Sequence, residues 1–538
     1  MDSYAFDAVI FDMDGILTKT AIVHAEAWKL VFDEYLQLRQ KRSNEPFREF
    51  ELPNDYLTYV DGKPRAKGIS SFLESRGIHL PLGLPEDPLE AETIYAIGNK
   101  KNNKFRQVLE TEGVQVYSST IELIEELKKL GFKVGVVSSS KNCQYILESA
   151  KILDLFQTRV DGVVAQEMGL EGKPEGDIFV EAALKLGTTP DRSVVVEDAI
   201  SGVQAGRNGG FGLVIGVARS NNELELQRNG ADVVVKDLAD LDIKWIQKWF
   251  CRKPIPLFEA WENRKKIEEF YAQFQADNPK VIINYNYLRD LKSIFSSQNN
   301  IVFFLDYDGT LTPIVDRPEL AVISDAMKNV VRKIADKFTT AIVSGRMRED
   351  VENLVGIKGL FYAGSHGFDI LGRGISMVQS KAKETMPIVN KVINQLKNEI
   401  GAIEGVIIEE KKFSVAVHYR LVKEQYLSKI SEAVQRIVGE NSVLRMMSGK
   451  KVYEILPAID WNKGKAVRWI MQALGLTWED SSVIYIGDDT TDEDAFRAVR
   501  SRGVGILVSS VPRESSADFQ LSSPDETRKL FEMLVASS

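Results

Sequence analysis

Short runs of β-branched and aromatic residues recur along the chain, separated by helix-like stretches such as TIELIEELKKLG. Runs of this kind, bounded by polar or turn-forming residues, are typical of strands buried inside a sheet. Their alternation with helices predicts an α/β fold with doubly wound, Rossmann-like parallel sheets, whose ligands bind beyond the carboxyl ends of the strands. The runs begin at Ala8, Lys133, Ser193, Leu213 and Asp232, and again at Ile301, Thr339, Ser482 and Val504.

The runs form two sets, because AVIFDMDGILTKT at the start of the chain returns later as IVFFLDYDGTLTPI. In each copy a strand-like run ends in Asp-x-Asp-Gly and a turn-forming tail. The chain of 538 residues also exceeds the size of a single hydrophobic core. We therefore expect two domains, at 1–244 and 299–538, with 245–298 as a linker. The linker contains an amphipathic stripe at helical spacing, expected to pack in a core and formed by Ile267, Phe270, Tyr271 and Phe274.

The two copies differ in the chain that is inserted between their motifs. In the first copy the insertion, at about 19–115, reads as mostly helical and includes AIVHAEAWKLVFDEYL. In the second, at about 370–455, the strand-like pieces VIIEEKKFSVAVHYR and KKVYEILP flank a helix. We expect a helical cap over the first site and an α/β cap over the second.

Composition and charge narrow the classes of function. Hydrophobic residues make up 44% and charged residues 27%, which is ordinary for a globular protein and argues against extensive disorder. The formal net charge of −9 argues against nucleic acid or an anionic membrane surface as a partner. Cys143 and Cys251 are too few for a disulfide framework, and we find neither a secretory signal nor an apolar stretch that could span a membrane. These features predict a cytoplasmic enzyme, and they leave its oligomeric state undetermined.

The first Asp-x-Asp-Gly motif carries two carboxylates suited to phosphoryl transfer. Residues at i and i+2 of an extended segment share a side, so Asp12 and Asp14 can face one phosphorus atom. Asp12 would form an aspartyl-phosphate, and Asp14 would act as general acid and base. An anionic nucleophile that approaches a phosphate needs positive charge, which Mg²⁺ supplies through oxygen ligands. The candidate metal ligands are Asp12, Asp14, Glu197 and Asp198, and the candidate phosphate contacts are Lys173 and Ser138.

The second copy repeats this set of candidates. Asp306 would be the nucleophile and Asp308 the general acid and base. Ser344 follows a strand-like run, and Lys463 lies in DWNKGKAV, so both are candidate phosphate contacts. The expected Mg²⁺ ligands are Asp306, Asp308 and Asp488, and Asp489 and Asp492 are further acidic candidates.

The order of the motifs strongly resembles that of the haloacid dehalogenase superfamily: Asp-x-Asp-Gly, then Ser, then Lys, then acidic residues after a strand. The first half further resembles the β-phosphoglucomutase group, which has a helical cap just after the first motif. By this resemblance His24 would sense the acid-base aspartate, Arg65 in DGKPRAKG would bind phosphate from the cap, and SSSKN at Ser138 to Asn142 matches the group's second motif. The same motifs serve sugar-phosphate phosphatases, so a mutase acting on β-glucose 1-phosphate and a phosphatase both stay open.

The second half, from Ile301 to the carboxyl end, resembles trehalose-6-phosphate phosphatases. The resemblance rests on LDYDGTLTPIVDRP, SGR, YAGSHG, EEKKFSVAVHYR and KVYEILPAIDWNKG. A disaccharide phosphate has many hydroxyl groups and needs polar partners from a lid. The resemblance implies that Glu409, Lys412 and Glu454 bind the distal glucose, and that Arg346, His366 and Lys450 position the sugar or the cap.

We therefore expect a Mg²⁺-dependent enzyme with two activities. The second half would hydrolyse trehalose 6-phosphate to trehalose and phosphate, and the first would act on another sugar phosphate. The alternative is that one half is catalytically silent and senses sugar phosphate for the other. Two active halves are favoured, because both retain their nucleophile and their candidate metal ligands.

Overall fold

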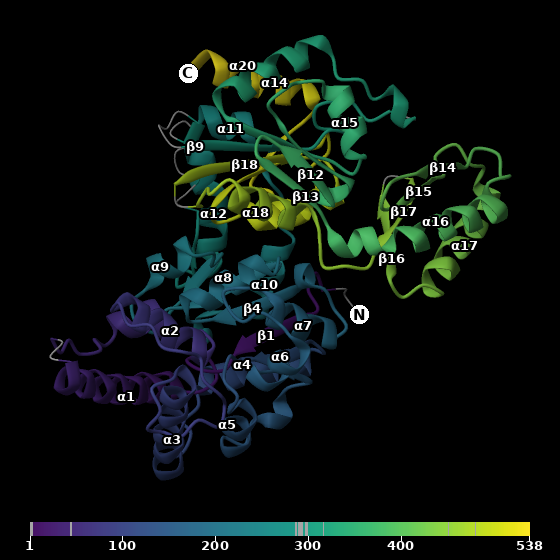
Figure 1. Cartoon of the computed structure of the whole chain (residues 1–538). Coiled ribbons are helices and arrows are strands. Elements are labelled where there is room, and N and C mark those ends of the chain that lie inside the picture. Colours follow the sequence, from purple (N-terminus) through teal and green to yellow (C-terminus); the bar gives the residue numbers. More distant parts are fainter. Residues whose placement is uncertain are drawn as a thin grey trace. The chain divides into compact units, whose positions relative to one another are not determined.

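The computed structural model describes residues 4–43, 46–285, 288, 294–295, 300–315, 317–449, 451–478 and 480–537. The chain divides into two compact units, formed by residues 1–252 with 269–286 and by residues 253–268 with 287–538. Each unit contains one large sheet between layers of helices (Figure 1).

The first unit is built on a seven-stranded sheet with the order β3-β2-β1-β4-β5-β6-β8. Strand β1 is buried along its whole length, pairs in parallel with β2 and β4, and ends at Asp12 beside Val137 of β2. The loops that follow these three strands therefore meet at one edge, as the parallel-sheet prediction requires. The strands are β1 (Ala8–Asp12), β2 (Lys133–Val137), β3 (Thr158–Val160), β4 (Ser193–Glu197), β5 (Leu213–Val217), β6 (Val233–Val235) and β8 (Ile282–Ile283). The helices around them are α4 (Ser118–Lys129), α5 (Cys143–Ser149), α6 (Gly162–Met168), α7 (Asp177–Lys185), α8 (Ile200–Asn208), α9 (Glu223–Arg228) and α10 (Ile243–Phe250).

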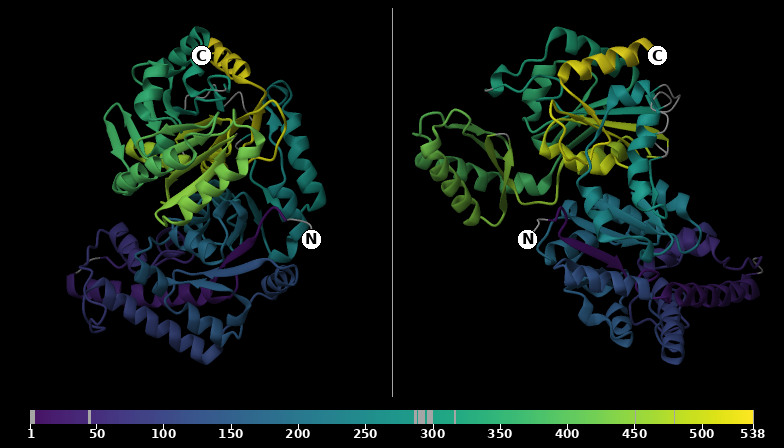
Figure 2. Two further views of the ribbon diagram at one scale, coloured as in Figure 1. Left: turned by 90° about the vertical axis from the view of Figure 1, so that its right-hand side faces the viewer. Right: turned by 180° about the vertical axis from the view of Figure 1, so that it is seen from behind.

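The cap of the first unit is helical, in agreement with its sequence pattern. It comprises α1 (Thr20–Ser43), a π-helical turn (Tyr56–Val60), α2 (Arg65–Ser75) and α3 (Ile94–Glu112). Its core is aromatic: the ring of Phe32 lies 5.1 Å from that of Phe50 and 4.4 Å from that of Phe72. Helices α1 and α3 pack against each other (Figure 2), so the cap has a core of its own.

The second unit repeats the plan with a nine-stranded sheet of order β13-β12-β11-β10-β9-β18-β19-β20-β7. Strand β9 lies between β10 and β18, parallel to both, and Asp306 follows it directly. The strands are β7 (Ile255–Pro256), β9 (Asn300–Leu305), β10 (Thr339–Val343), β11 (Phe361–Gly364), β12 (Asp369–Gly372), β13 (Ile375–Val378), β18 (Ser481–Gly487), β19 (Gly503–Val508) and β20 (Phe519–Leu521). The helices are α11 (Leu257–Glu262), α14 (Asp325–Lys337), α15 (Arg348–Val355), α18 (Lys463–Ala473), α19 (Glu493–Val499) and α20 (Pro524–Ser537).

The cap of the second unit is an antiparallel sheet of order β14-β15-β17-β16, packed against two helices. Its elements are α16 (Ser380–Ile400), β14 (Ile407–Glu410), β15 (Val415–His418), α17 (Leu427–Gly439), β16 (Leu444–Gly449) and β17 (Val452–Pro457). The expected start near residue 370 is too early, because β12 and β13 form a hairpin that pairs with β11 of the core sheet. The cap therefore begins with α16.

The segment 245–298 is not the separate linker that its sequence suggested, because it contributes a strand to each sheet. Strand β8 extends the first sheet by pairing with β6, and β7 extends the second by pairing with β20. Helix α12 (Lys265–Asp277) carries the predicted stripe, of which Ile267, Tyr271 and Phe274 are buried. Phe274 packs edge-on against Trp245 of the first unit, with ring centroids 6.1 Å apart. Among the described residues, no helix combines the length and the apolar character that crossing a membrane requires.

Candidate active sites

The first candidate site surrounds the turn that follows β1. Asp12 is 5% exposed, and the turn is closed by a hydrogen bond from the Gly15 amide to the Thr18 carbonyl oxygen, at 2.8 Å. Gly15 has a φ of +87°, and a Cβ atom there would lie 1.8 Å from Oδ2 of Asp198. Only glycine fits this position, both for its backbone and for the approach of the Asp198 carboxylate.

A buried lysine joins the carboxylates of the first site. Lys173 is 1% exposed and pairs with both Asp12 and Glu197. Burial by itself would lower the pKa of Lys173, but the carboxylates of Asp12 and Glu197 raise it, so the ammonium group stays charged. The second oxygen of Glu197 accepts a hydrogen bond from the Ala199 amide at 2.7 Å. Glu197 thus anchors the lysine that contacts the candidate nucleophile.

Asp14 faces the cap rather than the lysine. Its carboxylate accepts a hydrogen bond from Thr20, and Nε2 of His24 lies 3.5 Å from it. Oγ of Ser138 lies 3.5 Å from its other oxygen. Burial opposes ionisation of Asp14, but His24 and Thr20 lower its pKa. His24 is thus beside the candidate acid-base residue, where the resemblance implied it.

A polar cluster on the cap side includes residues that the sequence did not single out. Arg65 donates to Oδ1 of Asn102 at 2.8 Å, and Asn142 donates to the same oxygen at 2.7 Å. Arg106 in turn donates to Oδ1 of Asn142 at 3.0 Å. Asn102 and Arg106 share a face of α3 through their i,i+4 spacing, a signal too common to identify them in advance. Lys101 contacts His24 and lies 4.6 Å from the ring centroid of Phe105.

The second candidate site has the same plan after β9. Nζ of Lys463 lies 2.7 Å from Asp306 and 2.7 Å from Asp492, and all three side chains are buried. Asp492 also accepts hydrogen bonds from Tyr485 at 2.6 Å and from the Asp488 amide at 3.0 Å. Asp492 therefore takes the place that Glu197 has in the first site. In the sequence Asp492 was only a further candidate, because the spacing of the acidic pair differs between the two sites. Glu197 directly precedes Asp198, whereas Asp492 follows Asp488 by four residues.

Each site contains a cluster of three acidic side chains whose oxygen atoms lie within 4.8 Å of one another. Such all-oxygen clusters fit a hard divalent cation such as Mg²⁺. Burial and the negative charge of the neighbouring Glu197 raise the pKa of Asp198. A bound cation would relieve the repulsion between these two carboxylates. The side chains of Asp14 and Asp308, which were expected among the ligands, lie outside these clusters. The clusters are Asp12, Glu197 and Asp198 in the first site, and Asp306, Asp488 and Asp492 in the second.

The turn glycine of the second site offers a test of the metal cluster. A Cβ atom on Gly309, whose φ is +80°, would lie 2.2 Å from Oδ2 of Asp488. We expect Gly309→Ala to displace Asp488 and to raise the Mg²⁺ concentration needed for half-maximal activity by about 10-fold or more. Gly374→Ala is the matched control, because Gly374 also has a positive φ, of +77°, but its Cβ atom would meet nothing within 4 Å. Equal Mg²⁺ dependence of the two variants would contradict the assignment.

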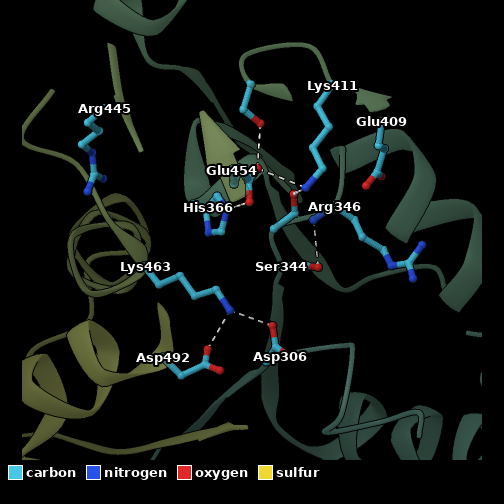
Figure 3. Close-up of polar contacts among 12 residues, drawn as sticks. Asp306, Ser344, Arg346, His366, Glu409, Lys411, Arg445, Glu454, Lys463 and Asp492 are labelled. Carbon is cyan, nitrogen blue, oxygen red and sulfur yellow. Dashed lines mark hydrogen bonds and ion pairs between the residues drawn. The ribbon is translucent and has the colours of Figure 1, made fainter. Parts of the chain in front are cut away.

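A cavity of about 230 Å³ lies in the second unit, lined by residues of both core and cap. Its floor includes Asp306 and Lys463. Above them the carboxylate of Glu454 contacts three polar groups: Lys411 at 3.1 Å, Ser414 at 2.7 Å and His366 at 3.1 Å (Figure 3). Burial disfavours the charge on Glu454, but Lys411 and His366 lower its pKa, so the carboxylate stays ionised.

Four of the predicted sugar contacts line this cavity: Arg346, His366, Glu409 and Glu454. Lys412 does not, because its ammonium group pairs with Asp369 at 2.6 Å, and Lys411 lines the cavity in its place. The physical reason is that side chains alternate between the two faces of β14 and of the turn that follows it. Lys411, two positions after Glu409, therefore shares its face, and Lys412, three positions after it, does not. Lys450, the sixth predicted contact, lies outside the described residues.

Arg346 holds the candidate acid-base residue of the second site. Its guanidinium group donates to both oxygens of Asp308, each at 2.7 Å, and its backbone amide donates to Oγ of Ser344 at 3.2 Å. A backbone hydrogen bond also connects the SGR motif with the YAGSHG motif, because the His366 amide donates to the Ser344 carbonyl oxygen at 2.9 Å. Motif residues far apart in the sequence thus meet beside Asp306.

Comparisons with known proteins find relatives of each of the two units. A trehalose-phosphatase family model matches residues 304–525, and a haloacid dehalogenase-like hydrolase model matches residues 6–210. The chain is 47% identical to a β-phosphoglucomutase of Mycobacterium bovis over 237 residues, which are 44% of this chain and 90% of the relative. It is 34% identical over 433 residues to a trehalose-phosphate phosphatase of Mycobacterium leprae, covering 78% and 92% of the two chains.

A third relative matches both units at once. It is an uncharacterized glycosyl hydrolase of Mycobacterium tuberculosis, 36% identical over 531 residues. The match covers 97% of this chain but only 37% of the relative, so the chain spans little more than a third of that protein's length. The chain belongs to the haloacid dehalogenase-like hydrolases, as a tandem of a β-phosphoglucomutase-like unit and a trehalose-phosphatase unit.

Proposed function

We propose that the second unit hydrolyses trehalose 6-phosphate to trehalose and phosphate. The observation that carries this proposal is the shared cavity, which has the candidate nucleophile at one end and charged cap residues at the other. Asp306 and Lys463 suit the phosphate, while Glu409, Lys411 and Glu454 suit the hydroxyl groups of a distal sugar. The trehalose-phosphate phosphatase relatives support the choice of sugar.

The reaction would proceed in two displacements at phosphorus. An oxygen of Asp306 attacks the phosphorus atom, the bond to the sugar oxygen breaks, and Asp308 donates a proton to that oxygen, which releases trehalose. Water then attacks the aspartyl-phosphate, Asp308 accepts its proton, and the bond to Asp306 breaks, which releases phosphate. Lys463 and Ser344 would hold the phosphoryl oxygens throughout. A Mg²⁺ ion held by Asp306 and Asp488 would neutralise part of the phosphate charge.

The direct test offers the full chain trehalose 6-phosphate or glucose 6-phosphate in the presence of Mg²⁺ and measures free phosphate. Both esters have the same primary leaving group, so only contacts with the second glucose distinguish them. We expect a clear preference for trehalose 6-phosphate, expressed in kcat as well as in KM, because remote binding energy assists the chemical step. No release of phosphate from trehalose 6-phosphate would refute the proposal.

For the first unit we propose a β-phosphoglucomutase. A mutase must hold a bisphosphate at two places, and the cluster around Arg65 suits the second of them. Arg65 and Arg106 lie close enough that burial and then the charge of Arg106 lower the pKa of Arg65 to about 10. Within the described part of the chain, neither arginine pairs with a carboxylate. Two positive charges this close together favour the binding of an anion between them.

The alternative function for the first unit is a sugar-phosphate phosphatase.

Replacing Arg65 discriminates between these two functions. With β-glucose 1-phosphate and a trace of the 1,6-bisphosphate, we expect the wild-type chain to form glucose 6-phosphate without free phosphate. Arg65→Ala should slow this conversion about 10- to 100-fold, through the loss of charge-assisted hydrogen bonds to the second phosphate. Arg48→Ala, at an exposed arginine of the same cap, is the control. Stoichiometric release of phosphate by the wild-type chain would favour the phosphatase instead.

A further inference from the structure

The acid-base aspartates of the two sites have different hydrogen-bond partners. Asp14 accepts a hydrogen bond from the neutral hydroxyl of Thr20, and among the described residues no arginine pairs with it. Asp308 stands in the same position after its nucleophile, but both of its oxygens accept N–H groups from Arg346. Within the described ranges, the second site alone has a guanidinium group paired with its acid-base residue.

This ion pair is well ordered by its surroundings. The side chain of Arg346 is 13% exposed, and its guanidinium group lies 5.5 Å from the ring centroid of Tyr307. Tyr307 is itself fixed by a hydrogen bond from its hydroxyl to the Ala321 carbonyl oxygen, at 2.8 Å. A planar guanidinium group that is stacked and bidentate is a specific arrangement, which a lysine would not reproduce.

The pair has a consequence for the proposed reaction. Asp308 must bring one oxygen to the oxygen that leaves phosphorus, and later to the attacking water. The bidentate pair uses both oxygens of an ionised carboxylate as acceptors, whereas a protonated carboxyl group carries a hydroxyl donor on one of them, so the pair and the donating acid disfavour each other. The acid-base residue is therefore withheld while Arg346 keeps this position.

The cap offers Arg346 another carboxylate. Glu409 of β14 lines the same cavity, and Figure 3 shows its carboxylate directed toward Arg346. Burial lowers the pKa of Arg346, but Asp308 raises it, and smaller contributions from Tyr307 and then Glu409 raise it further. His418 donates to Glu409 at 2.8 Å and lowers the pKa of Glu409 against the effect of burial, so this carboxylate is ionised and held in place.

We propose that Arg346 is a positioning residue that withholds Asp308 until the substrate-bound cap brings Glu409 to the guanidinium group. This inference rests on the proposed phosphatase function. A phosphate ester without the second glucose does not close the cap, so Asp308 stays paired with Arg346. The leaving group of that ester is then not protonated. Arg346 thereby makes the chemical step, and not only binding, depend on the whole disaccharide.

The test compares trehalose 6-phosphate with glucose 6-phosphate in the full chain with Mg²⁺. In Arg346→Gln, we expect kcat/KM for glucose 6-phosphate to rise, because Asp308 is no longer withheld from this ester, while kcat for trehalose 6-phosphate does not rise. The preference for the disaccharide should therefore drop about 10-fold or more. Arg346→Lys keeps the charge without the bidentate fork and should show the same loss of preference. An equal loss on both esters, or a change confined to KM for trehalose 6-phosphate, would overturn the inference.

A double-mutant cycle tests the exchange of partners. Glu409→Gln should lower kcat for trehalose 6-phosphate about 10-fold or more in the wild-type background, and by less than about 2-fold in the Arg346→Gln background. Equal costs in the two backgrounds would mean that Glu409 acts on the sugar independently of Arg346, against the inference. A wild-type chain that does not hydrolyse trehalose 6-phosphate at all would instead refute the proposed function.

Discussion

Asp306→Asn should lower phosphate release from trehalose 6-phosphate by at least about 10⁴-fold. The amide is nearly isosteric with the carboxylate but does not attack phosphorus, so the first displacement is lost. The fold should be retained, because Lys463 keeps Asp492 as a buried partner at 2.7 Å. The measurement is free phosphate under saturating substrate and Mg²⁺, with thermal unfolding of the variant followed in parallel.

The control for this variant is a second buried aspartate of the same unit. Asp518 is 6% exposed and accepts a hydrogen bond from the Gly505 amide at 3.0 Å, away from the cavity. Asp518→Asn should retain turnover, since it removes a buried charge without touching the reacting groups. Asp306→Asn should also leave the activity of the first unit intact. Retained turnover in Asp306→Asn would exclude Asp306 as the nucleophile.

Asp12→Asn should have the reciprocal effect. We expect it to abolish the formation of glucose 6-phosphate from β-glucose 1-phosphate, again by at least about 10⁴-fold, while hydrolysis of trehalose 6-phosphate continues. Asp12 ends a strand that is buried throughout and contacts Lys173, so the amide should alter the chemistry more than the fold.

Asp12→Asn also tests the alternative of a silent, sensing first unit. Asp161→Asn is the matched control: Asp161 is 1% exposed and caps α6, a role that asparagine performs equally well. If Asp12→Asn leaves every activity on a panel of sugar phosphates unchanged, the first unit is not a catalyst. A change in trehalose 6-phosphate hydrolysis alone would support the sensing role instead.

The sequence pattern was sufficient for the strands and for the residues next to them. The runs before Asp12 and Asp306 are local and strongly apolar, and both become central strands, β1 and β9, with the nucleophile candidate at the carboxyl end. The order of motifs then predicted which loops would meet, because parallel strands end at one edge. The helical and α/β caps were also predictable, from the difference between the two insertions.

Residues whose positions depend on contacts distant in sequence could not be assigned in the same way. Asp492 was a minor candidate until the structure placed it on Lys463, and Lys411 was passed over for Lys412. The same limit applies to the segment 245–298. Its two short strands became part of the sheets only because β6 and β20 leave backbone edges that need partners.

The sequence alone determined that two Asp-x-Asp-Gly sites exist, that each follows a buried strand, and which residues are the nucleophile candidates. These features are local, and the period of the hydrophobic pattern encodes them. The tertiary structure decided which polar and charged groups meet: Lys463 with Asp492, Arg346 with Asp308, and Arg65 with Asn102 beside Arg106. The reason is that electrostatic partners are chosen by distance and burial in three dimensions, and spacing along the chain does not specify either.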